Sequence, residues 1–348
     1  MSRYIMAIDQ GTTGTRIMLV DRTGRIASLA YSEFPQIYPR AGWVEHDPQV
    51  IWDTTVNMMN QALEKVSATG SDIAAIGITN QRETTVLWDR STLKPVHNAI
   101  VWQCRRSAPI CDELKSKGYS ALFQEKTGLI IDAYFSGTKI KWLLDNIPGL
   151  KSRARSGEIA FGTIDTWLIA KLTSGKIHAT DYTNASRTLI FNIHDKCWDQ
   201  ELLGILDIPP ALLPEVVNSA QIVGATDPSI LGAGVPIAGI AGDQQAALFG
   251  QGCFRQGEAK NTYGTGCFLL LNVGEREIEP GNGLILTLAC SENGSPCYAL
   301  EGSIFIAGAV VQWLRDGLCL IQNAIQSGEL ASSVENTNGV YMVPAFAG

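Results

Sequence analysis

The sequence predicts an α/β protein made of two related domains that enclose a nucleotide cleft. Three observations indicate this fold: a length of 348 residues, apolar strands that alternate with helical segments, and two glycine- and threonine-rich turns some 250 residues apart. A chain of this length exceeds what one hydrophobic core usually holds, so two domains are expected. We place them at residues 1–250 and 251–348.

The first of the two turns lies at residues 9–16, between two short apolar runs that predict a β-hairpin. Gly11 and Gly14 allow the backbone to bend sharply and to bring its N–H groups close to an anion. The threonine hydroxyls add donors, and Asp9 at the end of the first strand could hold a hydrated Mg²⁺. These features predict a cradle for nucleotide phosphates. An ordinary tight turn of common turn residues is the alternative.

The second turn lies at residues 261–268, again before an apolar strand, which suggests that two hairpins face one nucleotide. Other nucleotide sites are excluded by their motifs. A Walker-type loop is absent, because Gly175-Lys176 is followed by Ile177 rather than Ser or Thr. The Gly-x-Gly-x-x-Gly fingerprint of a dinucleotide fold and the His-Arg-Asp and Asp-Phe-Gly landmarks of protein kinases are also absent.

Composition and charge limit the classes of function. Apolar residues make up 45% of the chain and charged ones 18%, which is typical of a compact folded protein. A net charge of −7 argues against a nucleic-acid partner, and the longest strongly apolar run, 304–311, is too short to span a membrane. Eight cysteines without a Cys-x-x-Cys pair, and four histidines without metal-ligand spacing, predict reduced thiols in a cytoplasmic protein.

Hydrophobic periodicity and turn signals predict the remaining elements. Strands are expected at 26–31, 73–78, 99–102 and 235–242, and a hairpin at 284–300 around Asn293-Gly294, with a last strand-like run at 339–343. Helices are expected from Asp47-Pro48 to near Gly70, after Arg106 to about Lys117, and at 137–146, 163–172, 200–206 and 305–320, with a further one beginning at Asp243.

Polar and charged residues follow several of these buried strands directly. Arg82-Glu83 follows one strand, and Trp102 lies at the end of the next. Since α/β sheets place ligand chemistry at the carboxyl ends of strands, these residues predict a pocket, with a surface Arg82–Glu83 ion pair as the alternative. Asp243 also follows a strand. It is interpreted as a helix N-cap, as a general base aimed into the cleft, or as both.

Eight segments together make the chain similar to a known family. They are 9–16, 42–47, 77–84, 100–106, 135–142, 181–187, 239–250 and 261–268, and they occur in unchanged order. They resemble the glycerol-phosphorylating members of the FGGY family of carbohydrate kinases, within the actin-like ATPase superfamily of ribonuclease H-like domains. Members of that family continue well past position 348, and the chain stops in an apolar pattern. We therefore expect the second domain to be incomplete.

The resemblance implies phosphorylation of glycerol to sn-glycerol 3-phosphate by ATP and Mg²⁺, with roles for particular residues. The glycerol pocket would be formed by Arg82, Glu83, Trp102, Tyr134, Asp243, Gln244 and Phe268, with Asp243 as the general base. The phosphate side would be formed by Thr12, Thr13, Gly14, Arg16, Thr265, Gly308 and Gln312, with Asp9 near Mg²⁺. Gly14 stands where many members have Ser, so one hydroxyl is lost and the backbone donor remains.

A three-carbon triol suits this set of side chains. Arg82 can donate hydrogen bonds, Glu83 and Asp243 can accept them, and Trp102 and Phe268 can cover the carbon chain. Each aromatic could instead be plain core. Two other functions remain open: a kinase of a larger sugar, whose members usually have an acid where this chain has Gln103 and Cys104, and a non-catalytic nucleotide-binding protein. A homo-oligomer is also possible.

Overall fold

The largest sheet of the described residues carries the first hairpin. The computed structural model describes residues 3–264, 266–276, 278–281 and 283–344. Six strands lie in the order β13-β14-β5-β1-β2-β3. Their bounds are β1 (Tyr4–Gln10), β2 (Gly14–Asp21), β3 (Ile26–Glu33), β5 (Ile73–Asn80), β13 (Gly224–Ala225) and β14 (Pro236–Gly242). Strand β1 pairs antiparallel with β2 and parallel with β5, which pairs parallel with β14. The strand predictions in this part of the chain are confirmed.

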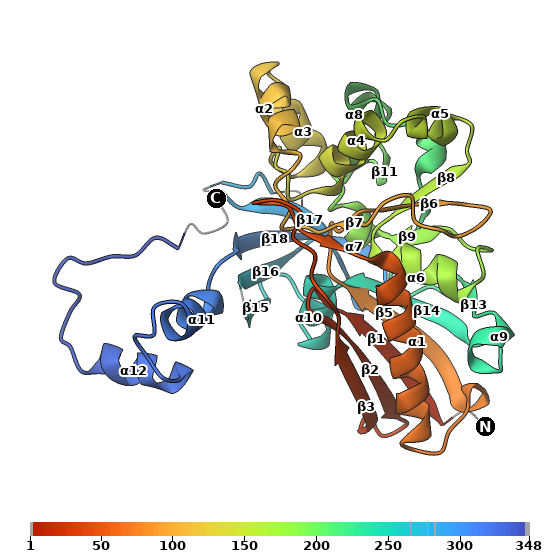
Figure 1. The fold of residues 1–348 in the computed structure, drawn as a ribbon, viewed down its shortest axis with the longest axis horizontal. Helices are drawn as coiled ribbons and strands as arrows, with labels where there is room; N and C mark the ends of the chain where they lie inside the picture. The colour runs from red at the N-terminus through yellow and green to blue at the C-terminus, as the bar shows by residue number, and fades with distance from the viewer. Residues whose placement is uncertain (1–2, 265, 277, 282, 345–348) are drawn as a thin grey trace.

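Helix α1 (Pro48–Glu64) lies across the strands of this sheet (Figure 1). The Asp47 side chain caps it by accepting a hydrogen bond from the Gln49 N–H, as Asp-Pro at a helix start predicts. Its buried face, which includes Ile51 and Met59, packs in one core cluster with the strands. The helix ends at Glu64 rather than near Gly70, because the chain turns at Ser67 with a φ of +49°.

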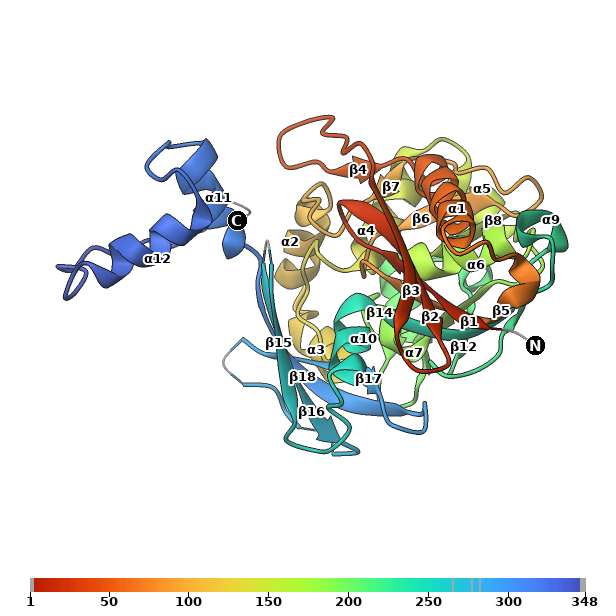
Figure 2. The ribbon, with the colours of Figure 1, turned by 90° about the horizontal axis from the view of Figure 1, so that it is seen from below.

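The second sheet is antiparallel, in the order β15-β16-β18-β17. Its strands are β15 (Ala259–Tyr263), β16 (Cys267–Gly274), β17 (Ile285–Cys290) and β18 (Pro296–Ile304). The predicted hairpin is confirmed, and Gly294 takes the positive φ of +84° that its turn requires. Helix α10 (Asp243–Gly250) contacts strands of both sheets and lies where they meet (Figure 2).

The long connection from β5 to β14 contains a group of helices and short strands. Its helices are α2 (Ala108–Ser116), α3 (Ser120–Thr127), α4 (Ser136–Asn146), α5 (Leu150–Arg155), α6 (Ile164–Leu172), α7 (Tyr182–Ala185), α8 (Gln200–Leu206) and α9 (Pro228–Leu231), with a 3₁₀ turn at Pro210–Leu212 and another before β5 at Gly70–Asp72. Its short strands are β6 (Val86–Asp89), β7 (Ala99–Ile100), β8 (Ile159–Gly162), β9 (Ala179–Asp181), β10 (Phe191–Asn192), β11 (Cys197–Trp198) and β12 (Glu215–Val217). Strand β4 (Glu45–His46), which precedes this connection in the chain, pairs with β7. Helix α6 packs in the same core cluster as the large sheet. The predicted helices are confirmed, whereas the strand at 99–102 stops at Ile100.

Near the C-terminal end, one predicted helix is shorter than expected and one predicted strand is wrong. The helix expected at 305–320 is limited to α11 (Gly308–Asp316), after which α12 (Ala324–Ser332) follows, and neither helix has a buried residue. Both stand away from the sheets (Figure 2). The described part of the run 339–343 forms no strand, since its exposed backbone has no neighbouring strand to pair with. No helix among the described residues is long and apolar enough to cross a membrane.

Candidate active site

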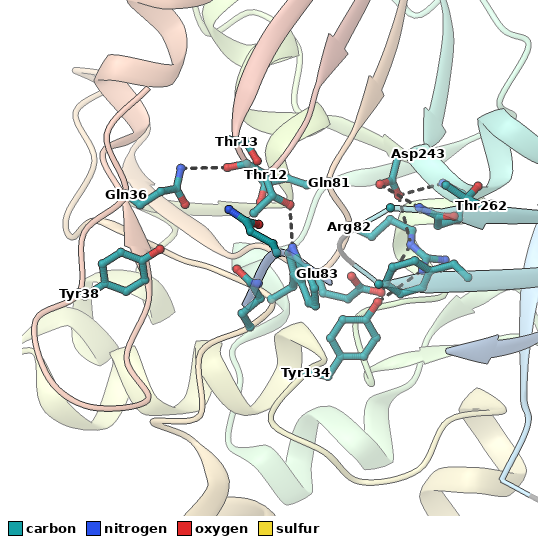
Figure 3. Close-up of a pocket in the computed structure, with 17 residues that line it drawn as sticks. Thr12, Thr13, Gln36, Tyr38, Gln81, Arg82, Glu83, Tyr134, Asp243 and Thr262 are labelled. Carbon is teal, nitrogen blue, oxygen red and sulfur yellow. Dashed lines mark hydrogen bonds and ion pairs between the residues drawn. The ribbon is translucent and has the colours of Figure 1, made fainter. Parts of the chain in front are cut away.

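A pocket of about 550 Å³ lies where both glycine- and threonine-rich turns meet the strand ends (Figure 3). It is lined by Thr12 and Thr13 of the first turn, by Thr262, Gly264 and Gly266 of the second, and by Gln36, Tyr38, Gln81, Arg82, Glu83, Trp102, Gln103, Tyr134, Asp243, Gln244, Phe268 and Gln312. All seven residues predicted to bind glycerol are in this lining. The structure thus brings together residues from both sheets and from the helical connection.

Arg82 and Glu83 are buried in the wall of the pocket, with side chains 2% and 1% exposed. The alternative of a surface ion pair is therefore wrong. The Arg82 Nε lies 3.7 Å from Glu83 Oε1 and 3.5 Å from Asp243 Oδ1. Its two terminal nitrogens donate to both oxygens of Glu301, at 2.6 and 3.0 Å. A bidentate pair of this kind holds the guanidinium in one orientation.

Arg187 and Glu301 complete a fully buried group of four charges. Arg187 Nε donates to Glu83 Oε1 at 2.6 Å, and Arg187 Nη2 donates to Glu301 Oε1 at 3.0 Å. Burial alone disfavours a charged Glu301, but Arg187 and Arg82 outweigh it and lower the pKa of Glu301 to about 2. At Glu83 the effect of burial is larger than that of Arg82 and Arg187, so the pKa of the Glu83 carboxyl is raised. Two positive and two negative charges thus balance beside the pocket.

Sequence reasoning missed Arg187 and Glu301 as site residues. An acid within the otherwise apolar strand β18 was the available signal for Glu301, because an unpaired buried carboxylate is costly. No spacing links either residue to Arg82, from which they are more than 100 positions away.

The backbone at Glu83 is strained. Its φ is +61°, a left-handed conformation that costs a residue with a side chain about 1–3 kcal/mol. Three donors hold the Glu83 carbonyl: the hydroxyls of Ser136 and Thr85, at 3.0 and 3.2 Å, and the Lys139 ammonium at 3.3 Å. Burial lowers the pKa of Lys139 to about 8. The surroundings therefore keep the Glu83 side chain aimed at the pocket and at Arg187.

Asp243 is the first residue of α10 and faces the pocket with 36% of its side chain exposed (Figure 3). The N-cap is Gly242, so the N-cap interpretation of Asp243 is wrong. Only glycine fits at that N-cap position, because a Cβ at Gly242 would lie 2.8 Å from Cγ and Cδ of Arg82. Asp243 Oδ1 accepts from the Gln244 N–H at 2.8 Å, and Oδ2 accepts from Gln244 Nε2 at 3.2 Å. Burial, partly offset by Arg82, raises the pKa of Asp243.

Aromatic rings form one side of the pocket. The ring of Trp102 lies 5.7 Å from that of Tyr134 and 6.3 Å from that of Phe268, both edge to face. Trp102 and Phe268 are only partly buried and line the pocket, so they are not plain core. The Trp102 Nε1–H donates to Thr12 Oγ1 at 2.8 Å. This bond joins the aromatic wall directly to the first turn.

The residues predicted for the phosphate side are less closely grouped. Thr12, Thr13 and Gln312 line the pocket. Gly308 does not line it, but its N–H donates to the Gly264 carbonyl of the second turn at 3.0 Å. Arg16 and Gly14 lie in β2 outside the lining, and Arg16 Nη1 pairs with Asp9 Oδ2 at 3.1 Å. Thr265 lies outside the described residues.

The glycine at position 14 is explained by crowding. A Cβ there would lie 2.5 Å from the Ser32 carbonyl and 2.9 Å from the Tyr31 ring. We therefore expect Gly14→Ser to lower the free energy of unfolding by about 1–3 kcal/mol, as overpacking does, measured by urea denaturation. The matched control is Gly77→Ser in β5, where a Cβ would meet nothing within 4 Å. Equal stability of the two variants would contradict this explanation.

The chain belongs to the FGGY family of carbohydrate kinases, whose N-terminal domain model matches residues 4–250 and whose C-terminal domain model matches residues 259–348. Among curated relatives, it is 61% identical over 348 residues to glycerol kinase of Thermoanaerobacter pseudethanolicus, covering 100% of the chain and 70% of the relative. It is 59% identical over 346 residues to glycerol kinase 2 of Thermotoga maritima, covering 99% of the chain and 70% of the relative.

A solved structure is similar over nearly the whole chain. The crystal structure of Plasmodium falciparum glycerol kinase with ADP matches with a TM-score of 0.90 and 40% identity, covering 99% of this chain and 69% of that one. Xylulose kinase from Lactobacillus acidophilus matches with a TM-score of 0.84 and 24% identity, covering 95% and 66%, and therefore supports the fold alone. The predicted two-domain, actin-like α/β fold is confirmed.

Proposed function

We propose that this chain transfers a phosphoryl group from ATP to a primary hydroxyl of glycerol, giving sn-glycerol 3-phosphate. The observation that carries the proposal is one pocket in which Asp243, Arg82 and Glu83 lie beside aromatic rings and between both glycine- and threonine-rich turns. The names of the relatives support it, since the matches at 57–61% identity are glycerol kinases. The ADP in the Plasmodium falciparum structure supports the nucleotide.

The geometry suits phosphoryl transfer, in which the protein mainly positions the reactants and neutralises charge. Arg82 and Glu83 offer a donor and an acceptor to neighbouring hydroxyls, while Trp102 and Phe268 cover the carbons. Asp243 lies 3.5 Å from Arg82 and accepts the proton of the attacking hydroxyl. Thr12 and Thr13 of the first turn and Thr262 of the second line the pocket, and their hydroxyls would donate to the phosphates of the nucleotide.

The position of Asp9 suits it to serve as one of several ligands of Mg²⁺. It is the last residue but one of β1, and its Oδ2 pairs with Arg16. No cluster of three acidic, His or Cys side chains among the described residues could hold a metal by itself. This agrees with the preference of Mg²⁺ for one or two carboxylates, waters and substrate phosphates. The bound ion would neutralise charge on the phosphates, and Asp9 would anchor it.

We also propose that the chain divides at residue 250 into a polyol- and phosphate-binding part and a nucleotide-side part. The two family models end and begin at 250 and 259, and each sheet lies wholly on one side. A cytoplasmic location is proposed on the cysteines, because all eight are free thiols in the structure.

The direct test is a side-by-side assay of ATP-dependent phosphorylation of glycerol, xylulose and dihydroxyacetone. It is made on this chain and on the full-length Thermoanaerobacter pseudethanolicus relative, and the expected result is the highest kcat/KM with glycerol. A preference for xylulose would contradict the assignment, since a pocket that pairs each hydroxyl of a triol disfavours a longer sugar.

The pH dependence follows from Asp243. A general base acts when it is deprotonated, and burial raises the pKa of Asp243 above the ordinary value of about 3.9. We expect kcat/KM for glycerol to fall as the pH decreases, with a midpoint above about pH 4. Burial also raises the pKa of Glu83. To separate the two carboxyls, the residual activity of Asp243→Asn is measured over the same pH range. An unchanged acid limb in that variant would contradict the role of Asp243.

A further inference from the structure

Lys260 is a buried lysine beside the pocket that no step above uses. It lies on β15 of the second sheet, whereas Asp243 follows β14 of the first sheet. Its exposed fraction is 6%. Its ammonium donates to Gln244 Oε1, to Thr262 Oγ1 at 2.9 Å and to the Phe268 carbonyl at 3.0 Å. All three acceptor residues line the pocket. With three protons and three acceptors, the ammonium is fully satisfied.

This contact decides the orientation of the Gln244 amide. An ammonium is only a donor, so the amide atom that faces it must be the oxygen. The amide nitrogen is then turned toward Asp243, where it donates to Oδ2 at 3.2 Å. With the opposite orientation, the amide oxygen would face the carboxylate and repel it. The charge of Lys260 therefore acts on Asp243 in two ways: directly through space, and through the Gln244 amide that both residues contact.

We propose that Lys260 is a positioning residue for the reaction: from the second sheet it locks the Gln244 amide, and this amide holds the Asp243 carboxylate in place. The inference rests on the proposed function, in which Asp243 is the base. It also means that the base is correctly held only when the second sheet is packed against α10.

The other charges around Asp243 do not replace this contact. Arg82 Nε lies 3.5 Å from Oδ1, whereas Gln244 Nε2 donates to Oδ2, and the charge of Arg82 is shared with Glu83 and Glu301. Burial lowers the pKa of Lys260 to about 8, so the ammonium is charged throughout the acidic range in which Asp243 titrates. Below about pH 8 the charged Lys260 ammonium therefore donates to Gln244 Oε1 and fixes the orientation of the amide.

The test replaces Lys260 with Met, which keeps the aliphatic stem and removes the charge. The titration of the Asp243 carboxyl is followed by carbon-13 NMR, assigned with Asp243→Asn, together with kcat/KM for glycerol against pH. We expect the Asp243 midpoint to rise by about one pH unit, as loss of a nearby stabilising charge does. On the acid limb kcat/KM then falls about tenfold, mainly in kcat. The matched control is Lys171→Met, a partly buried lysine on α6 that contacts Trp52 and Trp167.

A second variant keeps the inference testable if Lys260→Met does not fold. Gln244→Met leaves Lys260 in place and is expected to shift the Asp243 midpoint in the same direction. In the double variant the combined shift should be smaller than the sum of the two single shifts, because the part of the Lys260 effect that passes through Gln244 is already lost. An unchanged Asp243 titration in either folded single variant, or fully additive shifts, would overturn the inference. If the wild-type protein does not phosphorylate glycerol, the proposed function fails, while the NMR titration still decides the role of Lys260.

Discussion

We expect Asp243→Asn to lower kcat for glycerol by about 10²–10⁴-fold, the usual contribution of a general base. Asn keeps the size of the side chain but cannot take a proton from the attacking hydroxyl. Arg82, Glu83 and the aromatic wall remain, so KM for glycerol should change far less than kcat. The measurement is steady-state kinetics with saturating ATP, in this chain and at the aligned position of a full-length relative.

The matched control for this variant is Asp53→Asn. Asp53 is exposed on α1 and only accepts a hydrogen bond from Gln49 Nε2, so wild-type kinetics are expected. A turnover of Asp243→Asn close to that of the wild type, with glycerol saturating, would exclude Asp243 as the base.

Arg187→Met should have the largest effect on stability. The change leaves Glu83 and Glu301 buried with Arg82 as their remaining guanidinium partner. Removing one partner of a buried ion pair costs about 3–5 kcal/mol, because the charge left behind is not hydrated. We expect a loss of this size in the free energy of unfolding, measured by urea denaturation, and weaker glycerol binding in calorimetry as Glu83 loses its partner.

An exposed arginine provides the comparison. Arg155 on α5 pairs with Asp207 at 3.0 Å, but its side chain is 62% exposed. Surface pairs of this kind contribute about 0–1 kcal/mol, so Arg155→Met should scarcely change stability. If the free energy of unfolding fell by the same small amount in both variants, the group of four buried charges would not contribute significantly to stability.

Elements whose signals are local could be predicted from the sequence. Asp47-Pro48 starts α1, and Asn293-Gly294 turns the β17–β18 hairpin, because capping and turn chemistry depend on a few adjacent residues. Two strand predictions failed because they depended on the surrounding structure. The run 339–343 has the composition of a strand, yet no strand lies beside it within the described residues. The strand at 99–102 is shortened to Ala99–Ile100, so that Trp102 can turn toward Thr12.

The residues of the candidate site also divide into those with a local sequence signal and those without one. Arg82, Glu83 and Asp243 could be found because each follows a buried strand directly, and the carboxyl ends of parallel strands meet at one edge of a sheet. The partners of Arg187, Glu301 and Lys260 could not be predicted, because they lie in other elements and no spacing records those contacts; for Glu301 the sequence held only the signal of an acid within an apolar strand.

The sequence by itself determined the α/β class, the two glycine- and threonine-rich turns and the residue types that suit a small polyol, since these follow from local backbone chemistry and strand order. Only the tertiary structure decided which charges are buried together and which way the Gln244 amide points. The physical reason is that burial and pairing set the energy of a charge, and both depend on residues that approach from distant parts of the chain.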